Sequence, residues 1–249
     1  MLKGLYSAVS AMIAGITNQA IKVHNSANID TPGFKQIFTT LQESNKTDVN
    51  IPTDSNIGPS YNHIGKLGLG VLTTEFQTNF SNGDLLVTNQ SLDLALQGDG
   101  FFRILTSEGE RFTRDGRFSR DANGFLVTID GNKIMNSDGV PILLPDGEPV
   151  IDSQGGIFIN GKKITNLGIS EFSNPETQLK NEGGNRFRAL EPISQSTEKT
   201  MVFQGYLEGS NVNAVDLMIG TKSYQAAQMM VQTQDELLGK SITTLGRTK

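Results

Sequence analysis

The first segment of the chain has apolar residues at a spacing of seven positions. Two rows, offset by three positions, contain Leu2, Val9, Ile16 and Val23 and then Leu5 and Met12. The second row weakens at Gln19, where a polar residue takes the apolar place. A repeat of this period predicts a helix with a narrow apolar face for contact with other helices. We expect the helix to end near Asn28, because Pro32 and Gly33 follow.

The last segment of the chain repeats the same period. Its apolar face is formed by Leu217, Tyr224, Val231, Leu238 and Leu245, to which we add Ile242. Asn213 is suited to cap the start of this helix, since Asp216 lies three positions later, as in a capping box. At ~1.5 Å per residue, each terminal helix would be roughly 40 Å long. A lone helix with such a face is only marginally stable, so the pattern favours packing between subunits over packing within one chain.

The middle of the chain is polar at first and then rich in turns. Residues 45–69 contain prolines, asparagines and glycines without apolar periodicity, and we interpret them as a polar loop. From residue 70 to residue 208, short alternating stretches are separated by turn signals such as Glu108-Gly109, Asp130-Gly131 and Asn160-Gly161. Such spacing is typical of hairpins in a β barrel or sandwich.

These patterns together predict an α+β fold. Long N- and C-terminal helices would form a coiled-coil assembly core, and a central all-β domain would lie between them in sequence. The predicted parts are an N-terminal helix with an extended arm over 1–44, the polar loop over 45–69, the β domain over 70–208 and the C-terminal helix over 209–249.

The composition excludes several kinds of site and partner. The 21 basic and 26 acidic residues give a net charge of −5, so we expect no nucleic acid partner. The chain has no cysteine, and its two histidines, His24 and His63, lie in no zinc-binding motif. The Asp-Gly pairs lack the spacing of an EF-hand loop. We predict no metal, no cofactor, no membrane-spanning segment and no cleavable signal peptide.

One pair of carboxylates leaves an enzymatic alternative open. Asp93 and Asp99 lie close together in sequence and would be the best-placed pair for glycoside hydrolysis. The chain has no tryptophan on which a sugar ring would stack, so we assign no catalytic residue. A β-domain protein that binds or hydrolyses cell-wall glycan remains the alternative from another functional class.

Four short segments resemble, in the same order, the motifs of the flagellar rod and hook protein family. They are residues 24–34 (HNSANIDTPGF), 92–102 (LDLALQGDGFF), 112–118 (FTRDGRF) and 207–213 (LEGSNVN). The resemblance covers nearly the whole chain, although His24 and Ser26 stand where the family usually has Asn and Leu. Rod subunits are the nearer branch of the family, and the hook subunit is more remote.

The resemblance implies a structural subunit of the bacterial flagellar basal-body rod, with a hook-type axial subunit as the alternative. Such a subunit would polymerise through its terminal helices into a hollow axial tube that transmits torque and conducts exported subunits. The implied partners are further copies of the chain, other rod, hook and ring proteins, and the export apparatus. The implied location is the rod that spans the periplasm. We assign subunit assembly to the apolar positions of both helices and to the motif residues Asn25, Asn28, Pro32, Gly33, Asn211 and Asn213.

Overall fold

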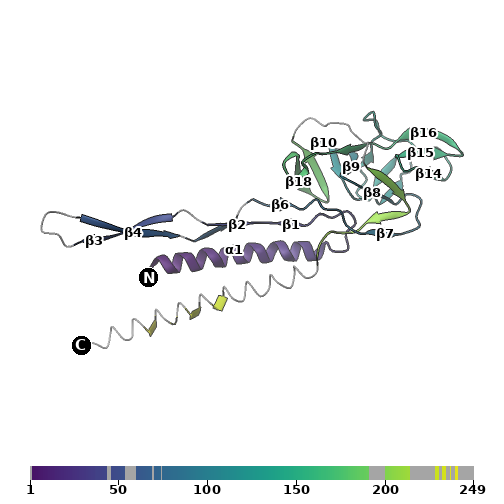
Figure 1. Ribbon diagram of the computed structural model, residues 1–249. Coiled ribbons are helices and arrows are strands. Elements are labelled where there is room, and N and C mark those ends of the chain that lie inside the picture. Colours follow the sequence, from purple (N-terminus) through teal and green to yellow (C-terminus); the bar gives the residue numbers. More distant parts are fainter. Residues whose placement is uncertain are drawn as a thin grey trace. The chain divides into compact units, whose positions relative to one another are not determined.

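The computed structural model describes residues 2–43, 46–53, 60–68, 70–73, 75–190 and 200–213, together with isolated positions between 228 and 240. The chain forms two compact units, whose elements are labelled in Figure 1. The first unit contains Met1–His24, Phe38–Gln77 and Asn213–Lys249, and the second contains Asn25–Ile37 and Thr78–Val212. The division passes through two short strands that pair with each other, β1 (Ile37–Phe38) and β6 (Gln77–Thr78).

The first unit contains the long helix α1 (Leu2–Ala27), whose last three residues belong to the second unit. The helix ends next to Asn28, where the sequence predicts its end. The hydroxyl of Ser10 accepts a hydrogen bond from the Val71 N–H at 3.1 Å, which connects α1 with strand β5 (Val71–Thr73). Strand β2 (Leu41–Glu43) pairs antiparallel with β5.

The segment 45–69, predicted to be a polar loop, contains a β ribbon instead. Strands β3 (Lys46–Thr53) and β4 (Ser60–Gly68) pair antiparallel, with a bulge between Val49 and Asn50. Val49 and Ile51 alternate with polar residues, which is the two-residue period of a strand. The surrounding prolines and asparagines hide this short period in the sequence, so the pairing was missed.

The second unit is built from antiparallel sheets. Its largest sheet has the order β11-β12-β13-β9-β10-β19-β18, and β17 pairs with β9. These strands are β9 (Gly100–Thr106), β10 (Gly109–Thr113), β11 (Phe118–Arg120), β12 (Leu126–Thr128), β13 (Lys133–Ile134), β17 (Ile169–Glu171), β18 (Leu179–Gly183) and β19 (Arg186–Ala189). A helix of four residues, α2 (Pro175–Gln178), precedes β18.

Three smaller sheets complete the second unit. One has the order β14-β15-β16, and two are pairs, β20 with β8 and β21 with β7. Their strands are β7 (Leu85–Val87), β8 (Leu94–Gln97), β14 (Pro149–Ile151), β15 (Gly156–Ile159), β16 (Lys162–Asn166), β20 (Met201–Gln204) and β21 (Tyr206–Glu208). Asn160 and Gly161 connect β15 to β16 with positive φ angles of 52° and 76°, which is the backbone of a type I′ hairpin turn. The turn predicted at this Asn-Gly pair is confirmed.

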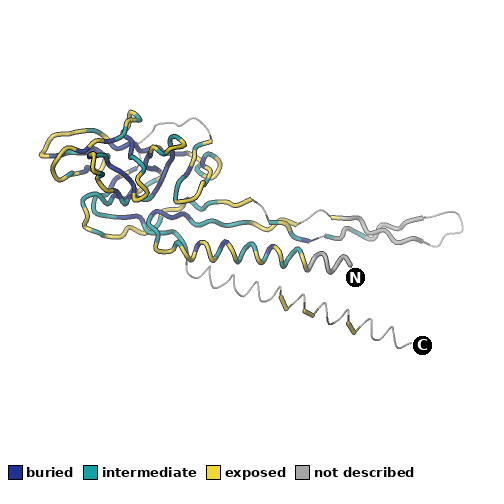
Figure 2. The backbone as a smooth tube through the Cα atoms, turned by 180° about the vertical axis from the view of Figure 1, so that it is seen from behind, coloured by how far each residue is buried: buried dark blue, intermediate teal, exposed yellow. Residues whose placement is uncertain are grey.

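Two groups of buried apolar side chains fill the second unit, which holds most of the buried chain in Figure 2. Strand β9 separates them, because successive side chains of a strand point to opposite faces. Phe102 and Ile104 belong to the larger group, whereas Phe101 packs with Phe112 and Phe187 in the smaller one. β9 therefore has apolar residues on both faces, and the charge of its buried Arg103 is bound by Glu110 and the Ser137 carbonyl oxygen.

The predicted fold class is wrong, because strands dominate the described residues. They form twenty-one strands and two helices, and α2 is too short to count as a terminal helix. The described residues therefore contain no coiled coil of two long helices. The seven-residue period marks an apolar helix face without specifying a helical partner. Among the side chains of α1 that the structure describes, the buried apolar ones are Ala14 and Ile21, which belong to neither predicted row.

Two other predictions concern the C-terminal segment and the division of the chain into parts. Of the predicted helix over 209–249, residues 209–213 are described and are not helical, and beyond them the structure describes only isolated positions. The four-part division of the chain stays a prediction. In the part of the chain that the structure describes, no helix is long and apolar enough to cross a bilayer.

Candidate functional site

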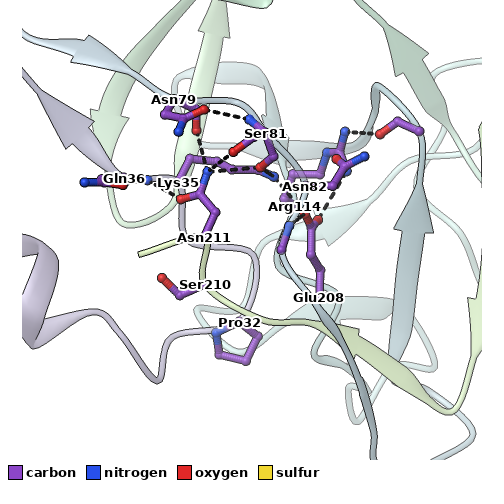
Figure 3. A network of polar contacts seen from close by, with 12 residues as sticks. Pro32, Lys35, Gln36, Asn79, Ser81, Asn82, Arg114, Glu208, Ser210 and Asn211 are labelled. Atoms are coloured by element: carbon purple, nitrogen blue, oxygen red, sulfur yellow. Dashed lines mark hydrogen bonds and ion pairs between the residues drawn. The ribbon is translucent and has the colours of Figure 1, made fainter. Parts of the chain in front are cut away.

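The carboxylate of Glu208, at the end of β21, holds two buried cations. Its Oε1 accepts a hydrogen bond from Lys35 Nζ at 2.7 Å, and its Oε2 accepts one from Arg114 Nη1 at 3.2 Å. The side chains of all three residues are only 1% exposed. Oε1 also accepts the N–H of Gly83 at 2.9 Å. Figure 3 shows these side chains converging from separate parts of the chain.

Arg114 connects this ion pair with the core of the second unit. Its Nη2 donates to the Gly98 carbonyl oxygen at 2.6 Å, and its Nη1 also donates to Asn82 Oδ1 at 3.3 Å. The guanidinium carbon lies 4.6 Å from the centroid of the Phe101 ring, within the range of a cation–π interaction. The guanidinium group of Arg114 therefore contacts three separate segments, which contain Asn82, Gly98 with Phe101, and Glu208.

Gly33 brings the segment after α1 against the same network. Its N–H donates to the Glu208 carbonyl oxygen at 2.7 Å. Its φ of 66° lies in the left-handed region, and a Cβ there would lie 2.4 Å from the Arg114 carbonyl group. Only glycine fits this backbone and this spacing. The preceding carbonyl oxygen, of Pro32, accepts a hydrogen bond from Asn185 Nδ2 at 2.9 Å.

Two asparagine side chains bind the neighbouring backbone. Asn211 Oδ1 accepts the Gln36 N–H at 2.7 Å, and Asn211 Nδ2 donates to the Asn79 carbonyl oxygen at 2.8 Å (Figure 3). Asn25 is 1% exposed and both accepts from the Ile37 N–H, at 3.1 Å, and donates to the Ile37 carbonyl oxygen, at 2.7 Å. Each amide thus takes the place of a strand partner.

All four sequence motifs meet in this network. Residues 24–34 supply Asn25 and Gly33, residues 92–102 supply the Gly98 carbonyl, residues 112–118 supply Arg114, and residues 207–213 supply Glu208 and Asn211. Segments separated by up to 175 positions are joined by direct hydrogen bonds. The motifs therefore define one buried site within the second unit.

Burial sets the electrostatics of the two cations. It lowers the pKa of Lys35 from its ordinary value of 10.5 to about 8, while attraction by Glu208 opposes the change. Burial also lowers the pKa of the Arg114 guanidinium, again against the attraction of Glu208. An arginine nevertheless keeps its charge at neutral pH. Two cations share one carboxylate, so removal of that carboxylate would leave both without a counter-ion in the interior.

Of the apolar residues assigned to assembly on α1, those whose side chains the structure describes lie mostly at its surface. Val9, Ile16 and Val23 are exposed, and Ile13, which belongs to neither predicted row, is exposed beside them. Met12 is half-buried. Leu2 and Leu5 lie in the helix, but their side chains are outside the description.

Of the other twelve assigned residues, six are described by the structure and six are not. Asn25, Pro32, Gly33 and Asn211 lie in the network, and Asn28 lies in the turn after α1, where its Oδ1 accepts from the Thr31 hydroxyl at 3.3 Å. Asn213 is exposed at the end of the last continuous described segment. The remaining six lie outside the described residues: Leu217, Tyr224, Val231, Leu238, Ile242 and Leu245.

Lys35, Arg114 and Glu208 were missed as site residues. A charged residue inside or beside each motif was the available signal, because such residues are rarely buried unless they are paired. The sequence does not show which basic residue forms an ion pair with which acidic residue. Lys35 and Glu208 are 173 positions apart, so their pairing depends on the fold.

The arrangement joins separate backbone segments of the second unit. The carboxylate of Glu208, the ammonium group of Lys35 and both terminal nitrogens of Arg114 bind other parts of the same chain. Within the described residues, no three His, Cys, Asp or Glu side chains gather closely enough to hold a metal ion. The site is suited to fixing the geometry of the chain.

Comparisons with known proteins point to one family. The flagellar hook protein FlgE/F/G D1 domain matches residues 95–171, and the flagellar basal body rod FlgEFG protein C-terminal region matches residues 204–245. The flagellar basal-body rod protein FlgF of Rhizobium meliloti is 32% identical, and the match covers 100% of both chains. The flagellar basal-body rod protein FlgG of Agrobacterium fabrum is 31% identical over 95% of this chain and 97% of its own. FlgG of Bacillus subtilis is 29% identical over 96% and 97%.

The variant Glu208→Gln tests the shared carboxylate. It keeps the shape of the side chain but removes the charge that Lys35 and Arg114 share. We expect the free energy of unfolding of the second unit to fall by about 3–5 kcal/mol, because two buried cations lose their partner. Urea unfolding followed by circular dichroism measures this loss.

The matched control is Asp146→Asn. It breaks an ion pair with Arg120 at 2.9 Å in which the Asp146 side chain is 99% exposed, so no measurable change is expected. Equal unfolding midpoints for Glu208→Gln and the control would show that the buried network does not stabilise the unit.

The lowered pKa of Lys35 predicts a pH dependence. Between pH 8 and 10.5 the unfolded chain binds a proton at Lys35 that the folded chain lacks, so a rise in pH favours the folded state. Relative to Lys35→Met, the wild type should gain up to about 1.4 kcal/mol per pH unit in this window. Urea midpoints of both proteins at pH 7, 8, 9 and 10 measure the difference. A constant difference, or one that moves against the wild type, would contradict the assigned pKa.

Proposed function

The chain belongs to the family of flagellar basal-body rod proteins, and from this premise we propose how it is built into the rod. It is a structural subunit of the rod, and its place is the flagellar basal body. We propose that copies of it polymerise around a hollow axis, contact other flagellar basal-body proteins and the surrounding ring, and act without enzymatic activity. The convergence of all four rod and hook motifs on the Glu208 network supports this proposal best.

The exposed apolar strip of α1 is the proposed subunit contact. Val9, Ile13, Ile16 and Val23 are 42%, 59%, 47% and 59% exposed. With about 3.6 residues per turn, these positions fall within about 80° around the helix axis. A continuous apolar strip of this kind is unfavourable in water. Burial against a neighbouring subunit would contribute about 1 kcal/mol for each half-exposed side chain.

The variant Val9→Asp tests the strip as a subunit contact. A charge within the strip should prevent rod assembly and reduce motility at least about ten-fold, because an unpaired carboxylate would have to be buried. The melting temperature of the purified protein should change by less than about 2 °C, since Val9 is exposed in the single chain. Rods in purified basal bodies, counted by electron microscopy, and thermal unfolding are the two measurements.

The control for this variant is Ile129→Asp. Ile129 is 67% exposed in the second unit, and the same charge there should leave assembly intact. A large loss of stability in Val9→Asp, or assembly as efficient as in the control, would contradict a subunit contact through α1.

We place the subunit in the distal part of the rod. Its motifs resemble those of the distal rod subunit most, and the proximal subunit is the near competitor. Identity to relatives does not separate them, since FlgG of Agrobacterium fabrum is 31% identical and FlgF of Rhizobium meliloti is 32% identical. The placement therefore rests on the motif pattern.

A strain that lacks this chain tests both the function and the position. We expect its basal bodies to retain a short proximal rod without the distal part, and we expect the wild-type chain to restore the full length. Electron microscopy of purified basal bodies measures the rod. Basal bodies in which the proximal rod is also missing would indicate the proximal position. A rod of normal length would refute the function.

A further inference from the structure

The chain crosses from one unit to the other at four points, which we call passages. The residues of the second unit at these passages are Asn25, Ile37, Thr78 and Val212. Within two residues of each passage lies a member of one set of hydrogen-bonded residues, which we call the crossing cluster. The crossing cluster consists of Asn25, Gln36, Ile37, Asn79 and Asn211.

Asn25 joins the first passage to the second. Its side-chain amide accepts from the Ile37 N–H at 3.1 Å and donates to the Ile37 carbonyl oxygen at 2.7 Å. Both bonds go to the last residue before the chain leaves the second unit. Because the Asn25 amide binds both backbone groups of Ile37, it fixes the distance between the two residues and prevents Ile37 from shifting along the chain direction.

Asn211 joins the remaining passages. Its Oδ1 accepts from the Gln36 N–H at 2.7 Å, and its Nδ2 donates to the Asn79 carbonyl oxygen at 2.8 Å. The Asn79 N–H donates in turn to the Gln36 carbonyl oxygen at 2.8 Å. Gln36, Asn79 and Asn211 thus form a closed triangle of hydrogen bonds among three passages, all on the second unit.

We propose that Asn25 and Asn211 are the mechanical coupling of this subunit, and that they hold the four passages in fixed register so that torque is shared among them. This inference rests on the proposed role in the rod. Hydrogen bonds are directional, so a cluster that connects every passage resists sliding of one passage past another. Apolar contacts alone resist sliding less, because they have no preferred direction.

The chemistry of asparagine explains the choice of residue. A primary amide offers donors and an acceptor on one short side chain, and both asparagines use both kinds of group on backbone atoms. Aspartate would keep the acceptor for the Gln36 N–H but would place a charge against the Asn79 carbonyl oxygen. Alanine would remove both kinds of bond.

The test compares Asn25→Ala, Asn211→Ala and Asn211→Asp with the control Asn123→Ala, which changes an exposed turn residue of the second unit. In the purified proteins, amide hydrogen exchange should accelerate at least about ten-fold at Ile37 in Asn25→Ala and at Gln36 in Asn211→Ala, because each variant removes the acceptor of that N–H. Asn211→Asp keeps the acceptor, so exchange at Gln36 should accelerate less in it than in Asn211→Ala. Exchange at Phe102 and Ile104, in the core strand β9, should be unchanged. The control should match the wild type at every amide.

The second readout is torque in living cells. Motors with a small bead should turn at the wild-type speed, whereas the stall torque with a large bead should fall at least about two-fold in the cluster variants. Because Asn25 and Asn211 act on adjacent residues of one passage, the double variant should be less than additive.

Several outcomes would overturn the coupling. Faster exchange throughout β9 would mean that the asparagines only support folding, and unchanged exchange would mean that the cluster does not hold the passages. Normal stall torque in complete rods would remove the mechanical role. Each of these leaves the rod function intact, which fails only if a strain without the chain builds a rod of normal length.

Discussion

The shared carboxylate of Glu208 is the interaction on which the second unit depends. Lys35 and Arg114 reach it across 173 and 94 positions of sequence, and all three side chains are buried. Two buried cations without a counter-ion would cost several kcal/mol, so this part of the chain is stable only when β21 is in place. The N-terminal motif is thereby tied to the C-terminal one by charge rather than by apolar packing.

The close approach of backbones follows from that charge. Once Glu208 lies between Lys35 and Arg114, the segments around it come too near for side chains. A Cβ on Gly33 would lie 2.4 Å from the Arg114 carbonyl group, and a Cβ on Gly83 would lie 2.1 Å from the Gly209 carbonyl oxygen. Gly33 and Gly83 are therefore as necessary as the charges, because they allow the distance at which the carboxylate holds both cations.

Sequence reasoning succeeded where the physics is local and failed where it is not. The end of α1 near Asn28 and the turn at Asn160 and Gly161 depend on neighbouring residues, and both predictions are confirmed. The predicted coiled coil was wrong because a row of apolar residues does not specify which element packs against it. The two-residue period of β3 and β4 was hidden by the polar residues around it. The Glu208 network was invisible because its pairing exists only in the fold, although each motif placed a residue there.

Beside its apolar core, the protein has polar contacts inside the second unit and apolar side chains exposed on its long helix. The second unit contains the hydrogen-bonded amides of Asn25 and Asn211 and the buried charges around Glu208, whose bonds have fixed directions and lengths. The long helix instead exposes apolar side chains at Val9, Ile13, Ile16 and Val23. Directional bonds hold one geometry under force, whereas an apolar surface packs against a neighbour without demanding one exact alignment. A subunit that must keep its own shape while it packs against many identical neighbours needs directional bonds inside and an apolar surface outside.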